Sequence, residues 1–472
     1  MADNKVEIRL NAVLARQRAA FLHEGAPSLD QRKADLLKLK TATLDRRKEF
    51  EAAVNADFGR RSAKETAIMD IMPIVFGIHY LRRNLAKWMR PHRRSVAAQF
   101  LPGRARVLYQ PLGVIGIMSP WNYPLVLSLM PLATALAAGN RAMIKPSEYV
   151  PATNEVLASM LRELFSEEQV AVVTGAADVG AAFSSLAFDH LVFTGSTSVG
   201  RSVMKAASEN LVPLTLELGG KSPVIVERGS PLDYAASSIA YGKLANAGQT
   251  CIAPDYVLVH EDEVTSFLAA YEKAVGTLYP DGPSNADYTA IISPRHHSRL
   301  RGLLDDARAK GARIIEIGTQ PATGDVRSLI LAPAVVLNAT DDMAVMKEEI
   351  FGPILPIATY RTIEDAIDYV NARPRPLALY YFGPNGQNRR KVLEHTTSGS
   401  VTINDTLLHY VQDDLPFGGV GPSGMGAYHG FEGFESLSHA KGIFEQARFN
   451  LSGMLRPPFG RVADLIMKAM LR

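Results

Sequence analysis

Residues 190–200 read HLVFTGSTSVG, and this short stretch changes character twice. His190 to Phe193 has the pattern of a buried strand, a turn containing glycine follows, and a helix is expected after Ser198. A strand, a glycine turn and a helix in this order have the placement of a dinucleotide-binding fingerprint. Thr197 stands where that fingerprint needs its central glycine, and a Cβ there hinders close approach of a pyrophosphate. The stretch therefore predicts a nucleotide bound in a related but different pose.

The alternation of strand and helix continues on both sides of this stretch. The first 90 or so residues have helical spacing, and the alternating units that follow end near residue 404. Strands are expected at 106–110, 114–118, 141–144, 170–173, 213–216 and 223–226, and helices at 125–138, 152–165 and 232–244. Such alternation indicates an α/β fold with helices on both faces of a parallel sheet and with ligands at the carboxyl ends of the strands.

Composition limits the class of protein. A chain of 472 residues is expected to form two or three domains, and 47% hydrophobic with 21% charged residues is ordinary for a globular protein. The net charge of +3 does not favour a nucleic-acid binder, and the basic stretch from Arg82 to Arg94 is expected to be a helix end or subunit contact. Neither a signal peptide nor a membrane span is predicted, and a single cysteine fits a reducing cytoplasm.

The C-terminal stretch is amphipathic. The last eleven residues are expected to form a helix with an apolar stripe, too short to cross a bilayer. Packing on the chain's own body or on a partner subunit is favoured over contact with a membrane surface, which stays open.

Polar side chains follow two of the expected strands. Residues 120–124 read PWNYP after the first, and Lys145 and Glu148 come directly after the strand at 141–144. A lysine that donates and a carboxylate that accepts could hold the hydroxyls of a ribose, although an exposed ion pair is the alternative interpretation. Because a carboxylate repels a ribose 2′-phosphate, this pair favours NAD over NADP.

Cys251 is the only cysteine of the chain, and a lone cysteine is more often a packing residue than a nucleophile. Its neighbours Gly248 to Thr250 are small or polar, which favours close approach of a ligand. Glu217 precedes two glycines at a strand end, one strand–helix–loop excursion before Cys251. A thiolate and a carboxylate facing one crevice suggest attack on a carbonyl followed by activation of water, with Asn122 as donor to the oxyanion.

Seven blocks together resemble the aldehyde dehydrogenase superfamily. They are PWNYP at 120–124, KPSE at 145–148, FTGS at 193–196, LELGGK at 216–221, GQTC at 248–251, KEEIFGP at 347–353 and PFGG at 416–419. They occur in the order of the family over about residues 100–425. The resemblance implies an NAD(P)-dependent oxidation of an aldehyde to the acid through a thiohemiacetal and a thioester. It also implies a Rossmann-like NAD-binding domain, an α/β catalytic domain and a small β oligomerisation segment.

The resemblance assigns roles to single residues. Cys251 would be the nucleophile, Glu217 the general base and Asn122 the oxyanion donor. The expected cofactor contacts are Ser119, Trp121, Lys145, Glu148, Gly175, Gly195, Ser196, Leu218, Glu349 and Phe351. From their place in the sequence, and not from the resemblance, Tyr123, Met118 and Leu127 are expected to line a substrate tunnel beside the oxyanion segment. Phe417, Tyr410 and His409 are expected to close its mouth, and ordinary packing is the alternative for each. No metal is predicted, and the pair His296–His297 is expected on the surface.

The resemblance also suggests an organisation. The NAD-binding domain would span 1–97 and 112–220, the catalytic domain 221–408, the bridging segments 98–111 and 409–445, and the tail 446–472. The short N-terminus and the C-terminal extension resemble the class 3 branch, typically dimers, and within it the bacterial coniferyl aldehyde dehydrogenases. A dimer interface is expected from the strand-like stretch 98–110 and the segment after Gly430.

Substrate and reaction partner stay open at this point. Aromatic aldehydes such as coniferaldehyde and medium or long aliphatic aldehydes both fit the branch, and NADP stays possible beside NAD. A membrane-associated fatty-aldehyde enzyme, a coenzyme-A-acylating enzyme, a phosphorylating relative and a non-enzymatic protein are the alternatives. Glu217 argues against the acylating enzyme, no phosphate site is identified, and the presence of both Cys251 and Glu217 argues against a non-enzymatic role.

Overall fold

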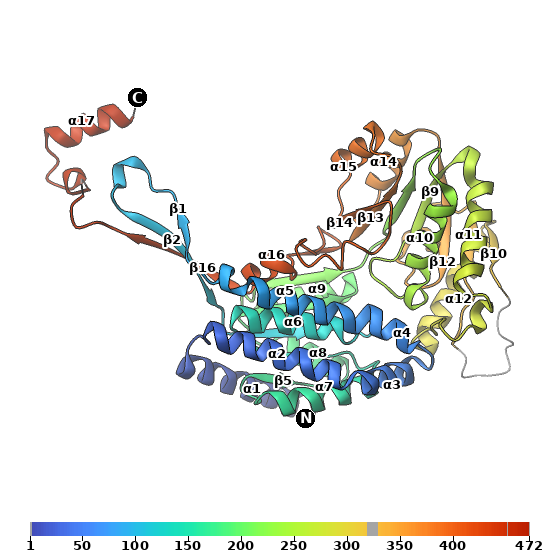
Figure 1. The fold of residues 1–472 in the computed structure, drawn as a ribbon, viewed down its shortest axis with the longest axis horizontal. Helices are drawn as coiled ribbons and strands as arrows, with labels where there is room; N and C mark the ends of the chain where they lie inside the picture. Colours follow the sequence, from blue (N-terminus) through green and yellow to red (C-terminus); the bar gives the residue numbers. More distant parts are fainter. Residues whose placement is uncertain (1, 319–328, 451, 472) are drawn as a thin grey trace.

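The computed structural model describes residues 2–318, 329–450 and 452–471 and shows two α/β lobes with an arm that leaves the first lobe (Figure 1). The sheet of the first lobe has the strand order β15-β7-β6-β3-β4-β5. Its neighbouring strands are parallel except for β15, which runs antiparallel to β7. The bounds are β3 Val114–Met118, β4 Arg141–Lys145, β5 Val170–Val172, β6 His190–Gly195, β7 Leu214–Leu218 and β15 Gly424–Met425.

Helices cover both faces of this sheet because its side chains alternate between two apolar cores. Val114 and Met118 of β3 belong to one core, with α1 (Ala2–Glu24), α8 (Ala177–Ser184) and α9 (Thr197–Ser208). Ile115 and Ile117 belong to the other, with α6 (Val126–Ala138) and α7 (Pro151–Leu164). Over these lie α2 (Leu29–Asp45), α3 (Arg47–Phe58) and α5 (Met72–Trp88).

The second lobe is also built on a mostly parallel sheet with helices, and its strand order is β10-β11-β12-β9-β8-β13-β14. Only β10 runs antiparallel to its neighbour. The bounds are β8 Pro223–Val226, β9 Tyr256–His260, β10 Arg313–Glu316, β11 Ala334–Leu337, β12 Ile354–Tyr360, β13 Ala378–Phe382 and β14 Ser400–Ile403. Its helices are α10 Leu232–Leu244, α11 Val264–Leu278, α12 Pro294–Ala309, α13 Ala344–Lys347, α14 Ile363–Asn371 and α15 Gln387–His395.

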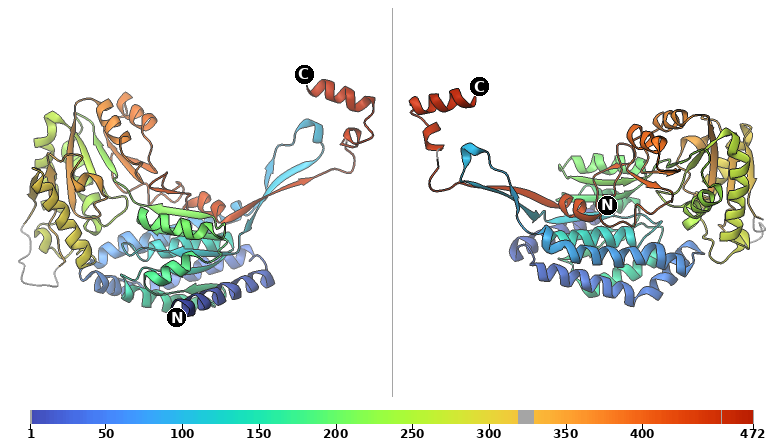
Figure 2. Two further views of the ribbon diagram at one scale, coloured as in Figure 1. Left: turned by 180° about the vertical axis from the view of Figure 1, so that it is seen from behind. Right: turned by 45° about the horizontal axis from the view of Figure 1, so that its top comes forward.

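The arm is a third, antiparallel sheet of order β1-β2-β16. It consists of β1 (His92–Arg94), β2 (Arg104–Pro111) and β16 (Ser438–Glu445), which follows α16 (Gly430–Ser436). It carries a 3-10 turn at Ser452–Leu455 and the helix α17 (Arg461–Met470) away from the two lobes (Figure 2). Most apolar residues of α17 are therefore exposed, Leu465 by 70%, whereas Ala463 is buried. Packing of this helix on the chain's own body is wrong for the single chain, whereas a partner subunit or a membrane stays open.

The α/β fold is confirmed, and the expected strands need small corrections. The stretch 98–110 was expected to be strand-like throughout, but Ala98–Phe100 is a 3-10 turn and β2 begins only at Arg104. Pro102 lacks the N–H that a central strand needs, so pairing starts after it. Glu217 was expected just after a strand and lies inside β7 instead. The domain boundaries stay a prediction.

Candidate active site

A strained loop precedes Cys251. Asn246, Ala247 and Gly248 have φ values of 52, 51 and 75°, a left-handed run that includes two residues other than glycine. A Cβ on Gly248 would lie 2.3 Å from the carbonyl oxygen of Gly352, so this position needs glycine. The buried amide of Gln249 holds the loop from inside, because its Nε2 donates to the carbonyls of Asn246 (3.0 Å) and Ala290 (3.1 Å). Such stored strain is typical of a site that must present one side chain in one direction.

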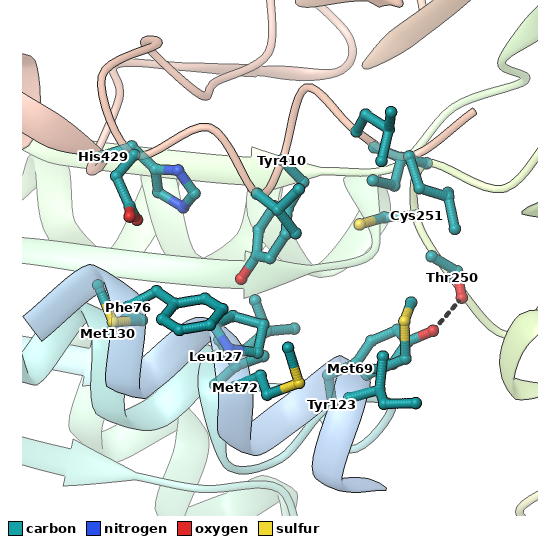
Figure 3. A pocket seen from close by; sticks show the side chains of 18 of the residues that line it. Met69, Met72, Phe76, Tyr123, Leu127, Met130, Thr250, Cys251, Tyr410 and His429 are labelled. Carbon is teal, nitrogen blue, oxygen red and sulfur yellow. Dashed lines mark hydrogen bonds between the residues drawn. The ribbon is translucent and has the colours of Figure 1, made fainter. Parts of the chain in front are cut away.

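Cys251 lies where two cavities meet. One has a volume of about 250 Å³ and lies between the lobes, because residues of both sheets line it. The other has a volume of about 380 Å³ and apolar walls that include Met69, Met72, Phe76, Leu127 and Met130 (Figure 3). Cys251 is the residue that lines both cavities. A molecule in either cavity can therefore reach the same sulfur.

Asn122 is buried beside the thiol loop and is held from several sides. Its side-chain Nδ2 donates to the carbonyl of Gln249 at 3.1 Å. Its own carbonyl accepts from Arg61 Nη1 and from Asn246 Nδ2, each at 2.9 Å. The amide has two N–H donors, so one remains for a ligand in the cavity that Asn122 and Cys251 share.

The charges around the thiol oppose its ionisation. Burial raises the pKa of the Cys251 thiol to about 12, and the carboxyls of Glu349 and Glu217 add to that rise. Burial also raises the pKa of Glu217 well above its usual range, and that of Glu349 to about 8. Neither carboxylate oxygen of Glu217 has a hydrogen-bond partner within the described residues. An acid in such a place is a strong base once it is ionised.

The first lobe offers polar groups for a nucleotide at its strand ends. Lys145 at the end of β4 donates to Glu148 at 3.0 Å, and a Cβ on Gly180 would lie 3.9 Å from the same ammonium group. At the end of β6, the Ser196 hydroxyl caps α9 by accepting from the amide of Val199. The N-terminus of that helix carries free N–H groups, which suit a phosphate. These groups fit the ribose and the phosphates of a dinucleotide.

The second lobe closes the other side of this cavity. A Cβ on Gly219 would lie 2.1 Å from Glu349 Oε2, so the carboxyl of Glu349 fits only over a glycine. Glu349 Oε1 is buried and has no hydrogen-bond partner within the described residues, which leaves it free to accept from a ligand hydroxyl. Phe351 has a left-handed φ of 52° and packs against Trp121 with ring centres 5.4 Å apart.

Two contributors to this cavity were not expected from the sequence. His296 packs on Trp121 with ring centres 5.0 Å apart and lines the cavity, so its expected surface position is wrong. Arg299, one turn later on α12, donates to the carbonyls of Glu349 and Ile350 and thereby fixes the Glu349 loop. The sequence does not reveal this contact between Arg299 and the Glu349 loop, because α12 and that loop meet only in the folded chain.

The structure brings many of the expected site residues together, but not all. One cavity is lined by Trp121, Asn122, Gly195, Ser196, Glu217, Cys251, Glu349 and Phe351. Ser119 is buried and bonded to Ser128 (Oγ to Oγ 2.7 Å), and Leu218 and Gly175 pack against Gly200 and Val179. Tyr123, Leu127 and Tyr410 line the apolar cavity, whereas Met118 lies in the core of the first lobe. Phe417 and His409 lie behind that cavity, stacked on each other at 5.9 Å.

The described residues hold neither a metal-binding cluster nor a membrane-spanning helix. No group of three or more histidine, cysteine, aspartate or glutamate side chains there could hold a metal ion. No helix among these residues has the length and apolar character that crossing a membrane requires.

Comparison with known proteins agrees with this geometry. The model of the "Aldehyde dehydrogenase family" matches residues 5–443. A "Probable coniferyl aldehyde dehydrogenase" of Pseudomonas aeruginosa is 53% identical, over 98% of this chain and 97% of the relative. The substrate-bound structure of Staphylococcus aureus AldH superposes with a TM-score of 0.92 at 35% identity, over 98% of this chain and 99% of that one. A Mycobacterium tuberculosis aldehyde dehydrogenase complexed with NAD+ gives 0.85 at 29% identity, over 94% and 91%.

Proposed function

Since the chain belongs to the aldehyde dehydrogenase family and oxidises aldehydes with NAD(P), we propose that Cys251 is its nucleophile, Glu217 its general base and Asn122 its oxyanion donor. The observation that carries this assignment is the position of Cys251 between a polar and an apolar cavity. Aldehyde and cofactor must meet at one atom from different sides, and the thiol is the group that both cavities share. Among the described residues Cys251 alone lines both cavities, and it is therefore assigned as the reacting centre.

The polar cavity is assigned to the cofactor. Lys145 and Glu148 would hold the adenosine ribose, Gly195 and Ser196 the phosphates, and Glu349 the nicotinamide ribose. Ser119, Trp121, Gly175, Leu218 and Phe351 are assigned to the same site. When bound, NAD accepts the hydride whose loss converts the thiohemiacetal to a thioester. The Glu148 carboxylate disfavours a ribose 2′-phosphate, so we expect NAD to be preferred while NADP remains usable.

The chain's own residues perform the other steps. The Cys251 thiol loses its proton to water, its sulfur forms a bond to the aldehyde carbon, and the carbonyl oxygen becomes an oxyanion that accepts from Asn122 Nδ2 and the Cys251 amide. Glu217 later removes a proton from a water molecule, whose oxygen attacks the thioester carbon. The acid leaves, and the sulfur regains a proton. Because Glu217 lies buried in the same cavity as the thiol, we expect the acyl group of the thioester to be transferred to water rather than to coenzyme A.

The substrate is proposed to be an aromatic aldehyde of the coniferaldehyde type. The apolar cavity would accept a flat ring, and the P. aeruginosa relative is named for coniferyl aldehyde. The same apolar walls also fit medium or long aliphatic aldehydes, the second candidate. Tyr123 is bonded to Thr250 (Oη to Oγ1 2.7 Å) and forms the wall next to the sulfur.

A dimer is proposed on the arm. The outer edge of β16 lacks a partner strand in the described chain, and the apolar stripe of α17 is exposed, so a second copy could cover both. Location in the cytoplasm stays a prediction.

Appearance of NADH with a panel of coniferaldehyde, benzaldehyde, hexanal and dodecanal tests the proposal. Wild type is compared with Cys251→Ala, whose rate should vanish, and Glu217→Gln, which should form the thioester in one burst and then stop. Activity that survives in Cys251→Ala would refute the nucleophile. Formation of an acyl-coenzyme A in preference to the acid would refute the role of Glu217.

A further inference from the structure

The apolar cavity has polar groups at the end far from the thiol. Its walls come from residues 68–76, from α6 and from the segments around residues 250 and 410, and most of them are apolar. Near Cys251 the two polar residues Tyr123 and Thr250 bond to each other. His429 and Met130 lie at the opposite end, with Tyr410 between them and the thiol (Figure 3). The end of the cavity that receives the distal part of a substrate is thus different in chemistry from its walls.

His429 is a buried polar side chain without a partner. It is 7% exposed, and neither ring nitrogen has a hydrogen-bond partner within the described residues. Its ring is fixed by packing on Tyr410 and Phe417, with ring centres 5.0 and 5.2 Å apart. Burial lowers its pKa to about 3, so the ring is neutral and presents one N–H donor and one acceptor nitrogen. An unpaired buried group of this kind favours a ligand that completes its hydrogen bonds.

Asp413 brings a carboxylate to the same end. It lines the cavity, and a Cβ on Gly77 would lie 3.3 Å from its Oδ1 and 2.3 Å from the end of Met130. Its carboxylate therefore lies near Met130, at the end where Figure 3 shows His429. It has no hydrogen bond or ion pair within the described part of the chain. Burial raises its pKa to about 6, which leaves it ionised and accepting at neutral pH.

We propose that Asp413 and His429 form a binding site for the phenol hydroxyl of a hydroxylated aryl aldehyde. The hydroxyl donates to the Asp413 carboxylate and accepts from the His429 N–H, while the Tyr410 side chain, which lies between His429 and the thiol in Figure 3, packs against the aromatic ring of the substrate. The aldehyde at the other end of the same molecule reaches Cys251. This inference rests on the proposed function and deepens it, because it selects hydroxylated aromatic aldehydes over plain aromatic and aliphatic ones.

The first test needs no variant. 4-Hydroxycinnamaldehyde and cinnamaldehyde differ by the single hydroxyl, and 4-methoxycinnamaldehyde keeps the oxygen but lacks the donor. A site built to pair with a hydroxyl discriminates against the analogue that lacks it, and we expect kcat/KM to fall by about 10–100-fold for both analogues. Binding to Cys251→Ala, followed by calorimetry, should show the same order of Kd values.

Variants then locate the discrimination. Asp413→Leu and His429→Phe should each bring the ratio of kcat/KM for the hydroxylated and plain substrates to within a few-fold of one. Asp413→Asn, which keeps an acceptor, should retain part of the ratio. Tyr80→Phe is the matched control, since its hydroxyl donates to the neighbouring Asp414 and it does not line this cavity. A merely structural role of Asp413 or His429 would lower both rates equally and leave the ratio unchanged.

The outcomes separate the two proposals. Equal kcat/KM values of wild type for the hydroxylated and plain substrates would overturn the phenol site and leave aromatic aldehyde oxidation intact. A preference that survives in both Asp413→Leu and His429→Phe would also overturn it. No oxidation of any cinnamaldehyde, with hexanal oxidised, would refute the aromatic substrate and the phenol site together.

Discussion

Cys251 is held in its protonated form by two carboxyl groups as well as by burial. Glu349 adds more to the rise in its pKa than Glu217 does. The pKa of Glu349 itself is raised to about 8, so its negative charge is present above that pH and largely absent below it. The thiol therefore faces a repulsion that depends on pH.

This repulsion predicts the behaviour of Glu349→Gln. Removing a negative charge lowers the pKa of the thiol and increases the thiolate fraction, but only where Glu349 is ionised. We expect alkylation of the cofactor-free enzyme by iodoacetamide to be about threefold faster or more in the variant at pH 9 and nearly unchanged at pH 6. Cys251→Ala gives the background rate. Faster alkylation at pH 6 to the same extent would contradict the charge effect.

Gly219 predicts a second effect at the residue scale. A Cβ at this position would meet all three carboxyl atoms of Glu349 within 2.4 Å. Gly219→Ala should therefore displace Glu349 and raise KM for NAD by about tenfold, with a change in unfolding free energy of less than about 1 kcal/mol. Gly276→Ala, where a Cβ has open space, is the control. An unchanged KM for NAD would show that Glu349 does not contact the cofactor.

Residue types in the sequence are sufficient to propose some of the site. Cys251, Glu217 and Asn122 carry reactive or donor groups in unusual local sequences, so their roles can be proposed from the chain's residues alone. His296, Arg299, Asp413 and His429 lie in ordinary local sequences, and their importance depends on neighbours that are distant along the chain. The prediction that Met118 lines the substrate cavity was wrong. Side chains alternate along β3, so Met118 points into one core of the first lobe while Ile117 points into the other.

At the scale of elements, α4 (Ala63–Thr66) and the π-helical turn Ala67–Ile71 connect the catalytic loops. Asp70 accepts from the amide of Val126 at 3.0 Å, at the start of α6, and pairs with the fully buried Arg61 at 3.4 Å. Arg61 in turn donates to the carbonyl of Asn122. Glu65 accepts from the amide of Asn246. This short segment therefore sets the positions of two loops, the one that carries Asn122 and the one that precedes Cys251.

Substitution of Arg61 should separate stability from catalysis. Arg61→Met leaves the Asp70 carboxylate buried without its partner, which typically costs about 3–5 kcal/mol, and frees the Asn122 loop. Arg61→Met with Asp70→Asn removes the charge and should recover much of the unfolding free energy. The double variant should still show kcat lowered by about tenfold or more, because the contact to Asn122 is missing. Recovery of kcat together with stability would refute a positioning role; urea unfolding and steady-state rates measure both.

Helices and strands could be predicted well from the sequence because their hydrophobic periodicities differ. The alternation from β3 to β8 was confirmed, and the helix α10 and strand β8 have the expected bounds. The predicted ends of these elements were less accurate, since Glu217 lies in β7 and residues 98–100 form a turn. Tertiary pairing lengthens a strand when a neighbour offers hydrogen bonds, as β15 does for β7, and local sequence does not reveal that neighbour.

At the scale of the whole molecule, the arm carries its apolar surface away from both lobes (Figure 2). Val462, Leu465 and Met470 of α17 are exposed by 51, 70 and 52%. Their spacing places them along one side of the helix. A stripe of this kind is expected to be covered in the assembled protein, although the sequence alone left both its occupant and its place in the fold open.

The arm predicts an effect on assembly. Leu465→Glu should raise the dimer Kd by about tenfold or more in sedimentation velocity, because a charge enters an apolar contact. Lys468→Glu, which changes a charge outside the apolar stripe, should have a much smaller effect. A wild-type monomer at micromolar concentration would contradict the dimer. Binding of that monomer to lipid vesicles, lost in Leu465→Glu, would favour the membrane alternative.

The position of Cys251 between two cavities also determines how its thiol reacts with oxidants. With its pKa near 12 the resting thiol is a poor target for peroxide, and it becomes vulnerable only when it ionises. A sulfenic acid formed there has no second cysteine in the chain with which to close a protective disulfide. Repair must come from a small thiol that enters through one of the two cavities. A bound aldehyde or dinucleotide therefore protects the sulfur and, once the sulfur is oxidised, also delays its rescue.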